Sequence, residues 1–324
     1  MLKKPVRRII KKGLLLIVPV YLLWFMYIQF MPNYYNRPTN TRWQFIKESL
    51  YKKYVIPDSD IIFLGESRVN AGVDFTQIPN TYSFASGGST PIEMYYILKK
   101  YAANYKKPKQ VYLSISPRFF SEVFAFHPHV LRNNLLAYPD MHEICAALQK
   151  GDTTLGNFTR LKFFFNKLNY IEYYQSDVLY NNVFGGHKEN IDLINEMIKQ
   201  KGGRPHPGLR DSCSELNYET SYEHFTPSEI LTHYFNLIFS FCKDEDIKLT
   251  FFFMPMNKSS YKALKPAFIK EYKTYIQGFQ TQYPEFNISD SVYFYPDSFF
   301  GDESHLNSKG KELFTKQFAQ KYSL

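Results

Sequence analysis

The sequence predicts an α/β protein whose parallel sheet has helices on both faces. Three short apolar runs lie within residues 60–65, 110–116 and 249–256, and each has the uninterrupted character of a strand buried on both faces. Helical patterns alternate with these runs, as is typical of parallel α/β proteins. Open sheets of this kind bind ligands beyond the carboxyl ends of their strands, so the residues after each strand are the first functional candidates.

The N-terminus predicts a membrane anchor. Six basic residues stand within residues 1–12, before any acidic residue, and residues 13–31 follow without a charge. Nineteen helical residues extend about 28 Å, close to the thickness of the hydrocarbon core of a bilayer. The basic cluster predicts a cytoplasmic N-terminus, with the following domain on the periplasmic or extracellular side of the cytoplasmic membrane. A cleaved signal peptide is the alternative, but no small-x-small cleavage site follows the run.

Charge and cysteine content exclude several classes of function. Six of the 39 basic residues lie in the N-terminal cluster, so 33 stand against 30 acidic residues in the rest of the chain. This balance gives no case for nucleic-acid binding. The three cysteines, Cys145, Cys213 and Cys242, have no metal-like spacing, and no phosphate-binding glycine loop is present. We therefore expect neither a metal ion nor a cofactor.

The rest of the chain divides into a linker with a helix, residues 32–57, and one domain, residues 58–324. Within the domain the pattern loosens over residues 119–226, which we interpret as a helical insertion over the carboxyl edge of the sheet. Outside the three apolar runs, strands are expected over residues 81–85 and 292–295. Helices are expected over residues 42–54, 141–150, 191–200, 226–244 and 259–283, the last kinked or split at Pro266.

The first apolar run ends in Gly65-Glu66-Ser67-Arg68. Gly65 allows a sharp turn at the carboxyl end of the strand, and a serine delivered into that turn is a candidate nucleophile. Taken alone, the stretch is better explained as a buried strand followed by an ordinary polar turn. Its meaning depends on whether the chain also supplies a base, an orienting acid and oxyanion donors.

A second motif follows the next strand. Gly87-Gly88 forms a flexible turn, Thr90 can cap a helix that begins with Pro91, and Glu93 stands where a capping box requires it. Such a unit exposes backbone N–H groups at a helix N-terminus, where they can bind an oxyanion. The alternative is a well-capped helix with no further role.

The third motif lies near the C-terminus, just past the last expected strand. Asp302 stands three residues before His305, and Asn307 or Ser308 can cap the following helix. An aspartate at this spacing can accept from Nδ1 of the imidazole, leaving Nε2 as a general base. We expect the first and last strands to come together, so that His305 reaches Ser67.

In this order, the three motifs resemble the SGNH hydrolase (GDSL esterase) superfamily. The resemblance covers most of residues 58–118 and 247–322. It implies that Ser67 is the nucleophile, His305 the general acid and base, and Asp302 its orienting partner. It also implies a three-layer α/β/α sandwich with a parallel sheet of about five strands.

The segment after the third strand departs from the pattern of the superfamily and points to particular groups within it. Esterases of this superfamily carry Gly-x-Asn-Asp after the third strand, with the asparagine as an oxyanion donor, whereas this chain has Ser-Ile-Ser-Pro-Arg-Phe-Phe at 114–120. That segment is similar to the membrane-anchored teichoic-acid D-alanylation proteins of the DltD group, and MPMNKSSY at 254–261 is similar to SGNH-like alginate O-acetyltransferases. Without the asparagine, the oxyanion candidates are the backbone N–H groups of Ser67 and of Gly87 or Gly88, with Arg118 as an electrostatic substitute.

The function implied is a membrane-anchored, serine-dependent acyl-transfer enzyme, an O-acyltransferase or O-deacylase, acting on a cell-envelope glycan or polymer. The alternative is a catalytically silent SGNH-like subunit that binds a multi-span membrane-bound O-acyltransferase or a glycan. Glu66 takes the place of the usual aspartate beside the nucleophile, and Arg68 is a candidate for steering an anionic polymer. Both residues also fit solvated positions flanking the serine.

Overall fold

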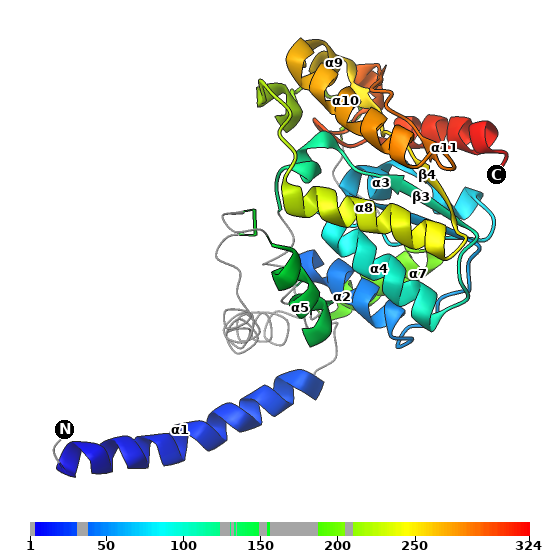
Figure 1. Cartoon of the computed structure of the whole chain (residues 1–324). Helices are drawn as coiled ribbons and strands as arrows, with labels where there is room; N and C mark the ends of the chain where they lie inside the picture. Colours follow the sequence, from blue (N-terminus) through cyan, green and yellow to red (C-terminus); the bar gives the residue numbers. More distant parts are fainter. Residues whose placement is uncertain are drawn as a thin grey trace.

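A five-stranded parallel sheet lies at the centre of the computed structural model, in the order β2-β1-β3-β4-β6 (Figure 1). The structure describes residues 4–30, 38–123, 130, 133, 135–148, 154–155, 187–204 and 210–324. The strands are β1 (Ile61–Gly65), β2 (Thr81–Ser83), β3 (Gln110–Ser114), β4 (Lys248–Phe251) and β6 (Asn287–Ile288). Every pairing between neighbouring strands of this sheet is parallel. The predicted α/β class is confirmed.

Successive side chains of the central strands point to opposite faces of the sheet, and each face has its own core. Ile62 and Leu64 belong to one apolar cluster, whereas Phe63 between them belongs to the other. The first cluster includes buried residues of α2 (Pro38–Leu50), α4 (Pro91–Asn104), α8 (Glu229–Asp244) and α10 (Pro266–Gln282). The second cluster includes residues of α3 (Ser67–Gly72) and α11 (Ser308–Tyr322). Helices therefore cover both faces.

The boundaries of the helices differ from expectation by a few residues. The segment expected over 259–283 is split at Pro266 into α9 (Lys258–Ala263) and α10. Helix α8 begins after Ser228 rather than at Thr226. Helix α2 begins before Arg42, and its Trp43, Ile46 and Leu50 are buried in the first cluster.

The expected meeting of the first and last strands is wrong. Strands β3 and β4 separate β1 from β6, and the strand at residues 294–295 lies outside the central sheet. That strand, β7 (Phe294–Tyr295), pairs with β5 (Met256–Asn257) in a sheet of its own. What joins the two ends of the domain is helix packing, because the Asp74 N–H just after α3 donates to the Thr315 hydroxyl of α11 at 2.9 Å.

The regular elements in the described parts of the insertion are helical, as expected. They include η3 (Pro117–Phe120), α5 (Tyr138–Ala147), α7 (His187–Lys199) and η5 (Tyr218–Ser221). Helix α7 packs against α2, where Met197 accepts from the buried Arg42 guanidinium. Much of residues 119–226 lies outside the described residues, so the expected position of the whole insertion stays a prediction.

The N-terminal helix α1 spans Lys4–Phe30 (Figure 1). In the described part of the chain, no helix is both long enough and apolar enough to cross a membrane. The anchor expected over residues 13–31 is thus not found there, and its last residue, Met31, lies outside the described residues.

Candidate active site

The turn that presents Ser67 depends on a glycine at the end of β1. A Cβ atom added to Gly65 would lie 2.4 Å from Cγ2 of Val69 and 2.9 Å from the carbonyl oxygen of Ser114. The chain can therefore reverse from strand to helix at this point only without a side chain. Ser67 follows as the first residue of α3, and Glu66 is the N-cap, accepting from the Arg68 N–H at 2.8 Å.

The glycine pair after β2 lies beside this serine. A Cβ at Gly87 would be 3.8 Å from Cβ of Ser67, and the Ser86 N–H donates to the carbonyl of Gly65 at 3.0 Å. Gly88 has a φ of +73°, which favours glycine. The capping box at the start of α4 is confirmed, with the Thr90 N–H donating to Glu93 at 2.7 Å.

Asp302 and His305 form the expected pair. Oδ2 of Asp302 lies 2.7 Å from Nδ1 of His305, and Oδ1 accepts from the backbone N–H groups of Ser304 and His305 at 2.8 and 2.7 Å. Burial opposes ionisation of Asp302, but its hydrogen bonds and the charge of His305 lower its pKa to about 2. The carboxylate is ionised at neutral pH and fixes the hydrogen of the imidazole on Nδ1.

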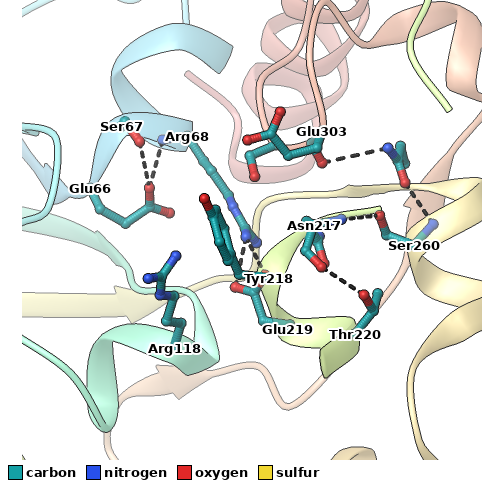
Figure 2. Close-up of polar contacts among 12 residues, drawn as sticks. Glu66, Ser67, Arg68, Arg118, Asn217, Tyr218, Glu219, Thr220, Ser260 and Glu303 are labelled. Carbon is teal, nitrogen blue, oxygen red and sulfur yellow. Dashed lines mark hydrogen bonds and ion pairs between the residues drawn. The ribbon is translucent and has the colours of Figure 1, made fainter. Parts of the chain in front are cut away.

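Glu66 holds the hydroxyl of the candidate nucleophile and is influenced by the charge of His305. The Ser67 hydroxyl donates to Oε2 of Glu66 at 3.2 Å (Figure 2). Burial raises the pKa of Glu66, while the charges of Arg68 and His305 oppose that rise. His305 is therefore within electrostatic range of the carboxyl group that holds Ser67.

The interpretation of Glu66 and Arg68 as solvated flanking residues is wrong. Only 1% of Glu66 and 6% of Arg68 is exposed. Nη2 of Arg68 donates to both carboxylate oxygens of Glu219, at 2.6 and 2.7 Å. Burial lowers the pKa of Arg68, but the charges of Glu219 and Glu66 more than compensate and raise it above its usual value. The steering role considered for Arg68 does not fit a guanidinium that is buried and already paired.

Arg118 reaches the same neighbourhood from η3. Its guanidinium carbon lies 4.1 Å from the centre of the Tyr218 ring, and its Nε donates to Glu122 at 3.1 Å. Tyr218 immediately precedes Glu219, the partner of Arg68, so one short segment contacts both arginines. Figure 2 shows Arg118 and Ser67 on the same side of the Tyr218 ring.

Residues 217–219 were missed by sequence reasoning. They form the start of the η5 turn, which contacts both arginines. The turn is also held to α9, because the Asn217 N–H donates to the Ser260 hydroxyl at 2.9 Å (Figure 2). In the sequence they read as part of a loosely patterned insertion with no motif of their own. Their partners Arg68, Arg118 and Ser260 lie on three other segments, so no local signal pointed to them.

Within the described ranges, no cluster of His, Cys, Asp or Glu could hold a metal ion. Among the residues that the structure describes, Cys145, Cys213 and Cys242 form no disulfide. No protein-family model matches the sequence, and a search of curated proteins finds no match.

Proposed function

We propose that the protein is a serine-dependent acyl-transfer enzyme of SGNH hydrolase type, an O-acyltransferase or O-deacylase acting on a cell-envelope glycan or polymer. The observation that carries this proposal is the convergence of three separate segments. Ser67 begins α3 with Gly87 beside it, and the Asp302–His305 pair lies within electrostatic range of the residue that holds Ser67. Nucleophile, base, orienting acid and glycine turn are the components that such a reaction needs.

The proposed reaction has two stages. The Ser67 hydroxyl turns from Glu66, gives its proton to Nε2 of His305, and bonds to the carbonyl carbon of an acyl ester. The oxyanion collapses, and the leaving alcohol takes the proton from His305. An acceptor hydroxyl or water then attacks the acyl-enzyme in the same way, which regenerates Ser67. Backbone N–H groups of Ser67 and of Gly87 or Gly88 are the proposed oxyanion donors, each contributing about 3–4 kcal/mol.

The proposed location is the outer side of the cytoplasmic membrane. Its support is the sequence of residues 1–31, a basic cluster followed by nineteen uncharged residues. We expect the protein to stay with the membrane fraction after a high-salt wash, and a protease added outside intact spheroplasts should cut the domain. Recovery in the soluble fraction would contradict the proposed location.

Labelling by a fluorophosphonate probe tests catalysis. We expect the wild-type protein to be labelled and Ser67→Ala to remain unlabelled, while Ser59→Ala, which removes another hydroxyl from the same domain, keeps the label. Equal unfolding temperatures would show that the variants are folded. The proposal fails if the folded wild-type protein never reacts and if envelope acylation in cells is unchanged by Ser67→Ala.

One observation favours a second function, that of a silent subunit bound to a membrane O-acyltransferase or a glycan. A hydroxyl donates only one hydrogen, and that of Ser67 is directed at Glu66. Co-purification with a multi-span membrane protein, undiminished by Ser67→Ala and without probe labelling of the wild-type protein, would support this second function.

A further inference from the structure

The carboxyl group of Glu66 has one oxygen engaged and one oxygen unused. Oε2 accepts from the Ser67 hydroxyl at 3.2 Å and from the Arg68 N–H at 2.8 Å. Oε1 is buried and has no hydrogen-bond partner among the residues that the structure describes. A buried carboxylate oxygen without a donor is costly, whereas the same oxygen carrying a proton can serve as a donor.

The charges around Glu66 do not require it to be ionised. Arg68 on α3 is committed to Glu219 on η5 through both carboxylate oxygens. Besides these two residues, the charged group acting on Glu66 is His305, before α11. Burial is the dominant influence, and it raises the pKa of Glu66. The burial of Glu66 and its unpartnered Oε1 therefore both shift it towards the neutral acid.

We propose that Glu66 is protonated on Oε1 and that this O–H donates to the oxyanion formed when Ser67 attacks an acyl carbonyl. The inference rests on the proposed acyl-transfer function. The oxyanion is two bonds from Oγ of Ser67, and Oγ lies against the Glu66 carboxyl group in the resting state. A neutral carboxylic acid in an apolar site can stabilise an oxyanion in this way.

In this step the Oγ proton passes to Nε2 of His305, Oγ bonds to the acyl carbon, and the carbonyl oxygen becomes the oxyanion. Glu66 keeps its proton throughout and donates only a hydrogen bond. The acid thus supplies the donor expected from the asparagine that the superfamily carries after the third strand, a position at which this chain has the segment Ser114–Phe120.

Substitution by glutamine separates the roles of donor and base. Glu66→Gln keeps a donor and an acceptor at the two positions, Glu66→Ala removes both, and Glu48→Gln alters another buried carboxyl group with a raised pKa, on α2. We expect Ser67 of the Glu66→Gln protein to be acylated by p-nitrophenyl acetate at a rate within a few-fold of that of the wild type. The rate for the Glu66→Ala protein should be about 10²–10³-fold lower, which is the effect of removing one oxyanion donor. The rate for Glu48→Gln should match that of the wild type.

The pH profile adds a second readout. The wild-type rate should fall at high pH as Glu66 loses its proton, and Glu66→Gln should lack that fall because its amide does not ionise. Infrared difference spectra between wild type and Glu66→Gln at neutral pH should contain the carbonyl band of a protonated carboxylic acid, whether or not an ester is present.

The proposal is overturned if Glu66→Gln is as slow as Glu66→Ala, which would indicate a carboxylate base, or if the protonated band is absent. Because Glu66 also caps α3, thermal unfolding must show that the Glu66→Ala protein is folded. If it is not folded, the pH profile of the Glu66→Gln protein tests the proposal instead. A wild-type protein that never acylates Ser67 instead overturns the acyl-transfer function, a result that does not depend on any Glu66 variant.

Discussion

Arg68 and Glu219 are 151 residues apart in the sequence and form a buried ion pair, with Nη2 at 2.6 and 2.7 Å from the two carboxylate oxygens. Arg68 is the neighbour of the candidate nucleophile, and Glu219 belongs to the turn that carries Tyr218. The pair therefore fixes the position of η5 relative to α3. It is a structural contact inside the site rather than a surface for substrate.

Removal of Glu219 should be strongly destabilising. Glu219→Gln removes the largest of the charges that compensate the burial of Arg68, and we expect a loss of about 3–5 kcal/mol in the free energy of unfolding. Arg68→Met combined with Glu219→Leu should lose much less, because it leaves no buried charge. Urea unfolding measures these differences. Glu215→Gln breaks the exposed Arg210 pair and should leave stability unchanged; equal losses from the two glutamine variants would contradict the prediction.

Gly65 should not tolerate a side chain. The Cβ of Gly65→Ala would contact Val69 and the carbonyl of Ser114 below 3.0 Å, and we expect destabilisation of about 1–3 kcal/mol together with slower probe labelling of Ser67. Gly278→Ala is the control, since nothing lies within 4 Å of its added Cβ and alanine favours the interior of α10. A Gly65→Ala protein as stable as Gly278→Ala would contradict this account of the turn.

The Asp302–His305 pair should make stability depend on acid pH. The pKa of Asp302 is lowered from 3.8 to about 2, so its contribution is fully present above about pH 4 and is lost as the pH falls towards 2. Asp302→Asn should therefore be less stable than the wild type at pH 6, with the difference shrinking by pH 2.5. Urea midpoints at the two pH values measure it, and a constant difference would argue against the ionised pair.

Asp302 should also matter for the rate. Asparagine in its place no longer fixes the hydrogen of His305 on Nδ1, and in a serine triad such a change lowers kcat by about 10⁴-fold. We expect a comparable loss in ester hydrolysis by Asp302→Asn at pH 7.5, where the variant, although less stable, should still be folded. A loss below tenfold would show that His305 does not depend on Asp302 for its tautomer.

Replacing Tyr218 should weaken the reaction with a large acceptor more than the hydrolysis of a small ester. Its side chain is 59% exposed beside Arg118, and an exposed ring at the proposed site offers an apolar face to a polymer. Tyr218→Ala should raise KM for an envelope polysaccharide while leaving hydrolysis of p-nitrophenyl acetate nearly unchanged. Leu216→Ala, at a residue 55% exposed two positions earlier, should change neither; equal effects of the two variants would exclude a specific role for the ring.

The parts of the site that the sequence predicted are those encoded locally. Gly65 and Ser67 are two residues apart at a strand end, and Asp302 and His305 lie on one turn, so spacing and residue type were sufficient. Strands β1, β3 and β4 were readable as apolar runs, and β2 was expected within residues 81–85. Strand β6, which has only two residues, was not predicted.

The parts that escaped prediction depend on contacts between distant segments. Glu66 and Arg68 carry charge, and charge alone suggests exposure; their burial follows from Glu219 and from helix packing that no local pattern reports. The order of the strands escaped for the same reason, since β6 joins the sheet beside β4 and the two ends of the domain meet through α3 and α11.

The packing of α11 on α3 also has a consequence for folding. Ser67 and His305 come from opposite ends of the domain, and the Asp74–Thr315 hydrogen bond that joins the end of α3 to α11 spans 241 residues. Contacts of such high sequence separation close large loops and form slowly. During synthesis, Ser67 and most of the sheet should therefore form long before His305 is in place. Ser67 should become reactive only when α11 packs against α3.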